Sequence, residues 1–160
     1  MARPREFEPD EALNKAMLLF WQKGYMETSM ADLVEATGVS RYGFYNEFGD
    51  KHDLFLKVLA HYSQTVIDRL MSPMETAVSA LPDIQTYFNR LQTFSQTIEQ
   101  PLGCLIGHTA MEMAEMDADI GNHIQNHYAR MHGAFANALQ NAKQQGQVSP
   151  KLDVTAHADF

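Results

Sequence analysis

Apolar residues recur every three or four positions along most of the chain, which is the spacing of one face of an α-helix. The first such stripe is formed by Leu13, Ala16, Met17, Phe20 and Trp21. Asp10 is placed to cap this helix and Gly24 to end it. Valine, isoleucine and threonine never form an alternating, strand-like run. The pattern therefore predicts an all-α protein.

Two short helices are predicted after the first one, with a glycine turn between them. Ser29 and Asp32 have the spacing of a capping box, and Gly38 ends the helix that they begin. Ser40 caps the next helix, which reaches about Phe48. Three short helices with such a turn before the third are typical of a helix-turn-helix.

The rest of the chain is also expected to be helical. A long helix begins with Asp50 as its cap and continues to Pro73, and residues 72–83 are expected to form a short helix and a loop. Glycine and proline residues separate the later elements. These are helices over 82–98, 104–116 and 117–145, and the first turns of another at 153–160.

Composition limits the class of protein. The 160 residues suit one domain or two small ones, and 45% hydrophobic residues are enough for a core. The formal charge of −8 argues against a polybasic tail, although a small basic face can dock DNA on an acidic protein. The single cysteine excludes an intrachain disulfide, and no apolar run approaches the ~18 residues of a membrane helix. We therefore expect a cytoplasmic protein with no membrane partner.

The segment TSMADLVEATGVSRYGFYNEFGDKHDLF, residues 28–55, resembles the DNA-binding domain of the tetracycline-repressor (TetR) family of bacterial transcriptional regulators. The resemblance covers about residues 9–62. The positions that match in register are Gly24 with an aromatic residue next to it, Thr28, Gly38-Val39-Ser40, Tyr45, Phe48, Lys51 and Leu54-Phe55. The resemblance implies a three-helix DNA-binding domain over residues 1–50, linked by a long helix from about residue 50 to 72.

The third helix of that family enters the DNA major groove. The residues expected here to contact DNA are Thr28, Ser29, Ser40, Arg41, Tyr42, Gly43, Tyr45, Asn46 and Lys51. Arginine can donate two hydrogen bonds to guanine, and tyrosine and asparagine reach phosphates or base edges. Phe44 and Phe48 fall on the opposite face, where they would anchor the short helix.

The remaining contacts rest on local chemistry. Thr28 or Ser29, at a helix N-terminus, can offer a hydroxyl and an amide to a phosphate. Gly43 permits close approach to the DNA backbone, and Arg3 and Arg5 are expected to form a mobile arm. One departure from the family is Glu47, where a basic residue or histidine is common. We therefore expect a small basic island and a steep dependence of DNA affinity on salt.

Residues 51–160 are expected to form a helical domain for ligand binding and dimerisation, lacking by comparison with the family its C-terminal dimerisation helices. The resemblance implies a repressor that binds a palindromic operator as a homodimer and is released by a small-molecule effector. We expect the complete protein to be a homodimer and the 160-residue chain alone to be monomeric or weakly associated. No cofactor is expected.

Candidate effector-binding residues lie on the apolar stripes of the second half, where ordinary core packing is the alternative. They are Tyr62, Phe88, Phe94, Cys104, His108, Met111, His127 and Met131, with Leu91, Met116 and Phe135 on the same stripes. Ten methionines suggest an adaptable lining. Gly-Cys-Leu at 103–105 resembles a subgroup of the family in which these residues open a helix, but it does not define the ligand.

Several alternatives stay open. Cys104, at a predicted helix N-terminus, is either an electrophile or oxidant sensor or a small buried hydrophobic residue. His123, His127 and His132 have metal-ligand spacing, but no cysteine or carboxylate is in register with them, and we expect no metal site. A small helical enzyme is disfavoured because no catalytic motif is present. An architectural DNA binder is disfavoured by the size of the apolar second half.

Overall fold

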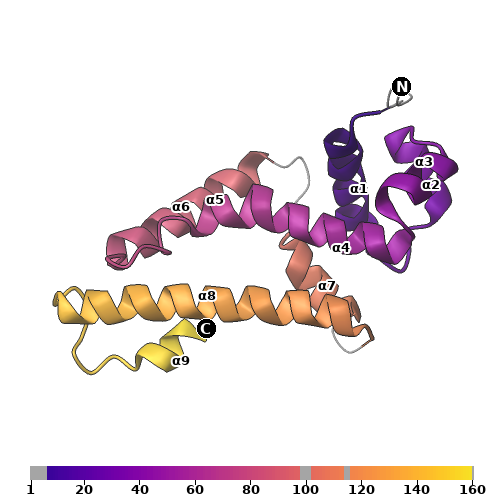
Figure 1. The fold of residues 1–160 in the computed structure, drawn as a ribbon. Coiled ribbons are helices and arrows are strands. Elements are labelled where there is room, and N and C mark those ends of the chain that lie inside the picture. Colours follow the sequence, from indigo (N-terminus) through magenta and orange to yellow (C-terminus); the bar gives the residue numbers. More distant parts are fainter. Residues whose placement is uncertain (1–6, 98–101, 114–115, 160) are drawn as a thin grey trace. The chain divides into compact units, whose positions relative to one another are not determined.

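The computed structural model describes residues 7–97, 102–113 and 116–159, and every regular element among them is helical, so the all-α prediction is confirmed (Figure 1). The elements are α1 (Pro9–Lys23), α2 (Met30–Thr37), α3 (Arg41–Phe48), α4 (Lys51–Tyr62), a π-helix η1 (Ser63–Ile67), α5 (Asp68–Met71), α6 (Leu81–Thr97), α7 (Leu105–Met113), α8 (Ala118–Gln144) and α9 (Val154–Ala158).

The chain divides into two compact units. The N-terminal unit contains residues 1–63 and 102–124, and the C-terminal unit contains residues 64–101 and 125–160. Helix α7 and the first turns of α8 thus belong with the N-terminal helices, although they lie far from them in sequence. The expected DNA-binding domain over residues 1–50 stays a prediction.

Aromatic residues form much of the core of the N-terminal unit. The predicted stripe of α1 is buried except for Leu13, which is half-buried. Phe20 meets the ring of Phe55 on α4 edge to face, with 4.8 Å between ring centroids. Trp21 meets Tyr62 in the same way at 5.2 Å. These contacts fix α1 against α4, and α4 also contacts α3 and α7.

Helix starts follow the predicted caps in three of four cases. Ser29 and Asp32 form the capping box of α2, and Ser40 accepts the N–H of Gly43 at 3.1 Å. Asp50 caps α4. The expectation that Asp10 caps α1 is wrong. That helix begins at Pro9, whose ring presets the backbone angle and which has no N–H to satisfy.

The long helix predicted up to Pro73 is not continuous. It is α-helical only to Tyr62 and becomes a π-helix over η1 before the single turn of α5. Ser63 Oγ donates to the carbonyl of Leu59 at 3.0 Å, a local bond that competes with regular helix geometry.

The short helix expected within residues 72–83 is also absent among the described residues, where turns lead into α6. Two asparagines of α8 hold these turns: Asn137 donates to the carbonyl of Thr76 at 3.1 Å, and Asn141 donates to that of Ala77 at 3.0 Å. These bonds satisfy carbonyls that a helix would have paired internally.

The C-terminal unit packs α6 against α5 and joins its other elements through side chains. Tyr87 meets Phe135 edge to face at 5.3 Å. Arg130 pairs with Asp68 at 2.7 Å and donates to Glu75 through a second nitrogen at 2.8 Å. Among the described helices, none combines the length and the apolar character that crossing a membrane requires.

Candidate nucleic-acid interface

Helix α3 separates an exposed polar face from a buried aromatic one. Tyr42 is 78% exposed and Tyr45 is 51% exposed, and Arg41 and Asn46 are exposed beside them. Phe44 and Phe48 are buried, as predicted. A short helix with little helical stability of its own depends on such anchoring. The four outward side chains are therefore held on a fixed support.

The C-terminal end of α3 is held by Lys57 of α4. Its ammonium donates to the carbonyl of Glu47 at 3.0 Å and lies 5.7 Å from the centre of the Phe48 ring. A cation at this position pairs with carbonyls that the helix leaves without partners. Lys57 was not predicted from the sequence, because its partner is a backbone atom ten residues away and leaves no trace in the sequence pattern.

The expectation that Thr28 offers its hydroxyl to a phosphate needs correction. The side chain is fully buried, and its hydroxyl donates to the carbonyl of Gly24 at 2.6 Å. Its N–H is also engaged, with the carbonyl of Tyr25 at 3.3 Å. Thr28 therefore shapes the turn between α1 and α2 from within.

Ser29 remains exposed at the start of α2. Its hydroxyl lies 2.7 Å from Asp32 Oδ2, which also accepts the Ser29 N–H at 2.7 Å. These hydrogen bonds, together with Lys23 at 3.0 Å, hold the pKa of the Asp32 carboxyl well below its usual range. The Ser29 hydroxyl is thus already part of the cap of α2.

Gly43 is tightly packed against the protein. A Cβ at this position would lie 3.0 Å from Val39 Cγ1 and 3.4 Å from the Phe7 ring. A side chain at this position would press on Val39, so glycine suits the packing inside the helix-turn-helix independently of any approach to DNA.

Lys51 is half-buried, and its ammonium lies 4.3 Å from the centre of the Tyr25 ring, within cation–π range. Burial lowers the pKa of Lys51, and nearby carboxylates of Glu112, Asp32 and Glu27 oppose that shift. The side chain lies along the turn that follows α1.

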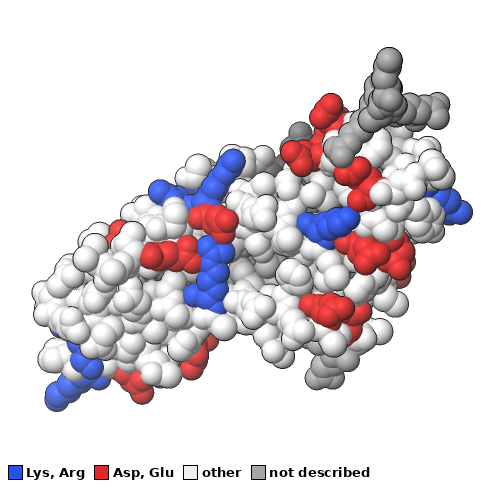
Figure 2. Space-filling model, viewed as in Figure 1, with Lys and Arg blue, Asp and Glu red and all other residues white. Residues whose placement is uncertain are grey.

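Charges of both signs are mixed on the surface. On the face drawn in Figure 2, lysine and arginine side chains lie singly or in small groups among aspartate and glutamate. On α3 itself, Arg41 is the basic residue and Glu47 the acidic one. The steep salt dependence expected from a small basic island stays a prediction.

Three candidate effector residues lie near one another in the N-terminal unit. Tyr62 donates its hydroxyl to Cys104 Sγ at 3.8 Å. The His108 ring approaches Gly103 so closely that a Cβ there would lie 3.2 Å from Nε2. Cys104 is exposed just before α7, where its carbonyl accepts the N–H of His108. The alternative of a buried Cys104 is therefore wrong.

The other candidates are scattered. Met111 is 82% exposed because it lies opposite the buried face of α7, and Phe88 is 54% exposed beside the buried Tyr87. Their assignment to interior stripes is wrong, as it is for Met116, which is 67% exposed, and for Leu91.

Two cavities lie in the C-terminal unit. Phe94 lines one of about 460 Å³ between η1, α5 and α6. Phe88 and Met131 line another of about 550 Å³ between α6, α8 and α9, together with Phe135 and Tyr128. His132 and Asp159, 3.1 Å apart, also line the second cavity.

His127 does not line either cavity and is buried on α8. Burial lowers the pKa of His127, and the positive charge of Arg130 lowers it further. The residue therefore favours its neutral form in the folded chain.

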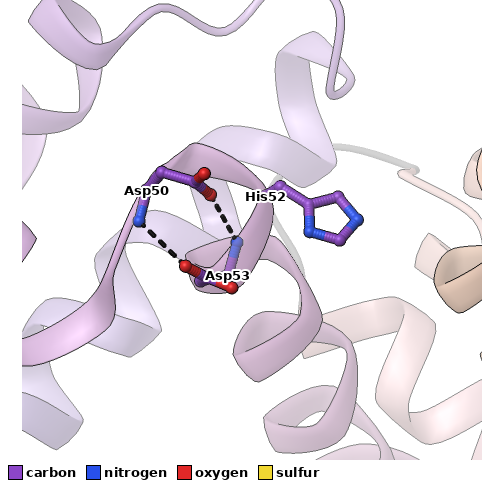
Figure 3. A group of neighbouring side chains, drawn as sticks. All are labelled: Asp50, His52 and Asp53. Carbon is purple, nitrogen blue, oxygen red and sulfur yellow. Dashed lines mark hydrogen bonds between the residues drawn. The ribbon is translucent and has the colours of Figure 1, made fainter.

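Acidic residues cluster around His52 in the N-terminal unit. Asp50, His52 and Asp53 lie close enough to share an ion, as do His52, Asp117 and Asp119. Figure 3 shows the two hydrogen bonds that join Asp50 and Asp53, which form the capping box of α4.

Asp117 caps α8 and lies 2.8 Å from His52. Its hydrogen bond raises the pKa of His52. Helix capping and this ion pair explain the positions of the acidic side chains around His52. The three histidines of α8 do not form such a cluster among the described residues.

Comparisons with known proteins agree with this arrangement. Residues 12–58 match the family of bacterial regulatory proteins, tetR family, and residues 80–160 match the tetracyclin repressor-like C-terminal domain. The chain is 36% identical to the HTH-type transcriptional repressor ComR of Escherichia coli, over 99% of this chain and 76% of ComR. It is 27% identical to the HTH-type transcriptional regulator YezE of Bacillus subtilis, over 100% of this chain and 83% of YezE.

Among solved structures, the chain is similar to CifR, a TetR family transcriptional regulator determined as a cysteine mutant with 26-base-pair double-strand operator DNA. The TM-score is 0.78 at 25% identity, covering 98% of this chain and 82% of CifR. The chain therefore belongs to the TetR family. It is a DNA-binding transcriptional regulator.

Proposed function

We propose that the protein is a homodimeric repressor that binds a palindromic operator through α3 and leaves it when a small-molecule effector binds. The observation that carries the proposal is that α3 has two different faces. One face is buried and aromatic, and the other exposes Arg41, Tyr42, Tyr45 and Asn46. A short helix with hydrogen-bonding side chains on its exposed face is the element that helix-turn-helix proteins place in a major groove. ComR is named a repressor, and CifR was solved with its operator.

In this proposal, residues 1–50 form the DNA-binding domain and residues 51–160 the regulatory domain. Arg41 reads base edges, Tyr42, Tyr45 and Asn46 contact phosphates or bases, and Ser40 lies at the start of the helix. Ser29 and Lys51 contribute to DNA binding from positions near the backbone phosphates. Gly43 contributes through the packing of α3, and Thr28 through the shape of the turn before α2.

The effector is proposed to bind in the cavity of about 550 Å³ in the C-terminal unit, whose volume suits a small organic molecule. Phe88, Phe135 and Tyr128 supply aromatic surface, and His132 with Asp159 supplies hydrogen-bonding groups. An apolar ligand with one polar end fits this lining.

Selection of duplexes from a random-sequence pool tests the DNA-binding part. Rounds of binding to the purified protein and sequencing should enrich one inverted repeat, called here the selected duplex, at concentrations high enough for two weakly associated chains to bind one duplex together. Enrichment of no sequence, at any salt concentration from about 50 to 200 mM (a range that changes phosphate-driven affinity by orders of magnitude), would contradict the proposal.

A second candidate function is electrophile or oxidant sensing by Cys104. The observation that favours it is an exposed thiol at the start of α7 with a tyrosine hydroxyl 3.8 Å from the sulfur. Modification by N-ethylmaleimide should then release the selected duplex from wild type and leave Cys104→Ser bound. Equal release, or none from either protein, would remove the sensor function.

A further inference from the structure

Glu112 of α7 holds the turn between α1 and α2 through both of its carboxylate oxygens. Oε2 accepts the N–H of Tyr25 at 2.9 Å, and Oε1 accepts the N–H of Met26 at 2.7 Å. The partners lie more than 80 positions apart in sequence, yet both belong to the N-terminal unit. An ionised acceptor makes shorter and stronger hydrogen bonds to amides than a neutral one. We call this pair of contacts the Glu112 clamp.

Gly24 makes the clamp possible. Its φ of +84° is a conformation that residues with side chains rarely adopt. A Cβ here would also lie 3.0 Å from Glu112 Oε2 and 3.2 Å from Oε1. The glycine therefore both turns the chain after α1 and leaves room for the carboxylate.

The clamped turn leads directly into the helix-turn-helix. Thr28 closes the turn by donating to the carbonyl of Gly24, and Ser29 then caps α2. The Tyr25 ring packs 4.8 Å from Phe55 and supports Lys51. Because α2 contacts both α1 and α3, the position of this turn determines how α3 is presented.

We propose that Glu112 is a positioning residue for DNA binding: the clamp holds α2 and α3 in the arrangement that reads the operator. The inference rests on the proposed function in assuming that α3 binds DNA. It assigns a role to a residue that does not lie on the DNA-reading helix.

The test compares Glu112→Gln and Glu112→Ala with wild type. Glutamine keeps the volume but replaces one carboxylate oxygen by an NH2 donor, so in this geometry one of the two backbone amides loses its acceptor. The control is Asn14→Ala, which removes another side-chain contact within the same unit, the 2.8 Å contact between Asn14 Oδ1 and His61 Nε2. Thermal unfolding shows whether each variant folds. If Glu112→Ala does not fold, the comparison of Glu112→Gln with wild type is sufficient for the test.

Two readouts are needed. Hydrogen exchange followed by NMR should show both the Tyr25 and the Met26 amide exchanging about tenfold faster or more in Glu112→Ala, and at least one of them in Glu112→Gln, as expected when a charge-assisted hydrogen bond is removed. Fluorescence anisotropy should show affinity for the selected duplex falling about tenfold, with affinity for a scrambled duplex unchanged. Asn14→Ala should keep the ratio of the two affinities.

The outcomes separate the two proposals. Faster amide exchange with an unchanged affinity ratio would make the clamp purely structural and overturn the inference. Unchanged exchange would show that the contacts do not protect the amides, which also overturns it. A wild-type protein with no sequence preference would overturn the proposed function and this inference together, whereas a preference that Glu112→Gln retains overturns the inference alone.

Discussion

At the scale of single residues, Arg41 provides the sharpest test of how DNA is read. It is exposed at the first position of α3, and it is the basic residue of that helix. Arg41→Ala should lose about 1–3 kcal/mol of binding to the selected duplex and should discriminate less at one base pair. Anisotropy against duplexes that vary one position at a time measures both effects.

The control for Arg41 is Arg69→Ala, an exposed arginine on α5 in the other unit. It should change neither the affinity nor the base preference. If Arg41→Ala binds all of the duplexes as wild type does, α3 is not placed in the major groove in the way proposed.

His127 gives a prediction about folding stability and its dependence on pH, not about DNA binding. Burial lowers the pKa of His127 in the folded chain, so the unfolded chain takes up a proton at higher pH than the folded chain does. Its contribution to stability is therefore fully present above the unfolded pKa of about 6.5 and is lost as pH falls through the folded pKa. Acid should destabilise the protein through this residue.

The measurement is the drop in melting temperature between about pH 8 and pH 5 (a window around the ~6.5 of an unperturbed histidine). It should be smaller in His127→Gln than in wild type, while His157→Gln, changed at an exposed histidine of α9, should keep the wild-type drop. Equal drops in all three proteins would assign the acid sensitivity to other groups.

His52 has the opposite effect on stability. Asp117 raises the pKa of His52, so the contribution of His52 to folding stability is lost as pH rises.

At the scale of elements, α3 shows how a short helix depends on its buried face. Phe44 is completely buried, so Phe44→Ala should cost about 3–5 kcal/mol of unfolding free energy and abolish binding to the selected duplex. Tyr42→Ala, two positions earlier but 78% exposed, should leave the unfolding free energy within about 0.5 kcal/mol and weaken DNA binding alone. Urea unfolding and anisotropy separate the two effects.

The pair is informative because both residues are aromatic and lie on the same helix. Equal losses of stability in the two variants would show that Tyr42 is part of the core. Full DNA binding by Tyr42→Ala would remove it from the interface.

Elements were predictable from the sequence where a local signal defines them. Ser29, Ser40 and Asp50 cap their helices as predicted, because a cap involves only residues three positions apart. The turns after Met71 were not predictable, since they depend on Asn137 and Asn141, which lie some sixty positions away. The π-helix also left no sequence signal that periodicity could reveal.

The candidate sites divide in the same way. The exposed and buried faces of α3 follow from its sequence, because helical spacing assigns them. Met111 and Phe88 were misplaced because an apolar residue at the edge of a stripe can face either way until its neighbours are known. Glu112 was not identified at all, since an isolated glutamate on a helix carries no mark of the backbone amides that it accepts.

At the scale of the whole molecule, the net charge of −8 affects how DNA is found. Each phosphate that a protein neutralises makes the fall of log affinity with log salt steeper by about 0.9. Because Arg41 is the one cation of α3, this relation argues for a shallower salt dependence than the steep one expected from the sequence. Binding must then depend on direct contacts and on the second half-site that two-fold symmetry adds. The second of these can be measured directly.

Two-fold symmetry predicts how the two halves of the selected duplex must be spaced. A recognition helix of eight residues covers few base pairs, so a homodimer is expected to place two copies of α3 in successive major grooves, about 34–36 Å apart. Inserting about 5 base pairs, half a helical turn of the ~10.5 in a full turn, between the half-sites moves one of them to the opposite side of the DNA. Affinity should then fall to that of a single half-site. Inserting a full helical turn puts both half-sites on the same side of the DNA again but increases the distance between them, so it should also lower the affinity. A monomer that binds each half-site independently would keep its affinity with either insertion.

Native mass spectrometry of the uninterrupted duplex should show two chains bound. A single bound chain, with unchanged affinity on the spaced duplexes, would contradict the homodimer.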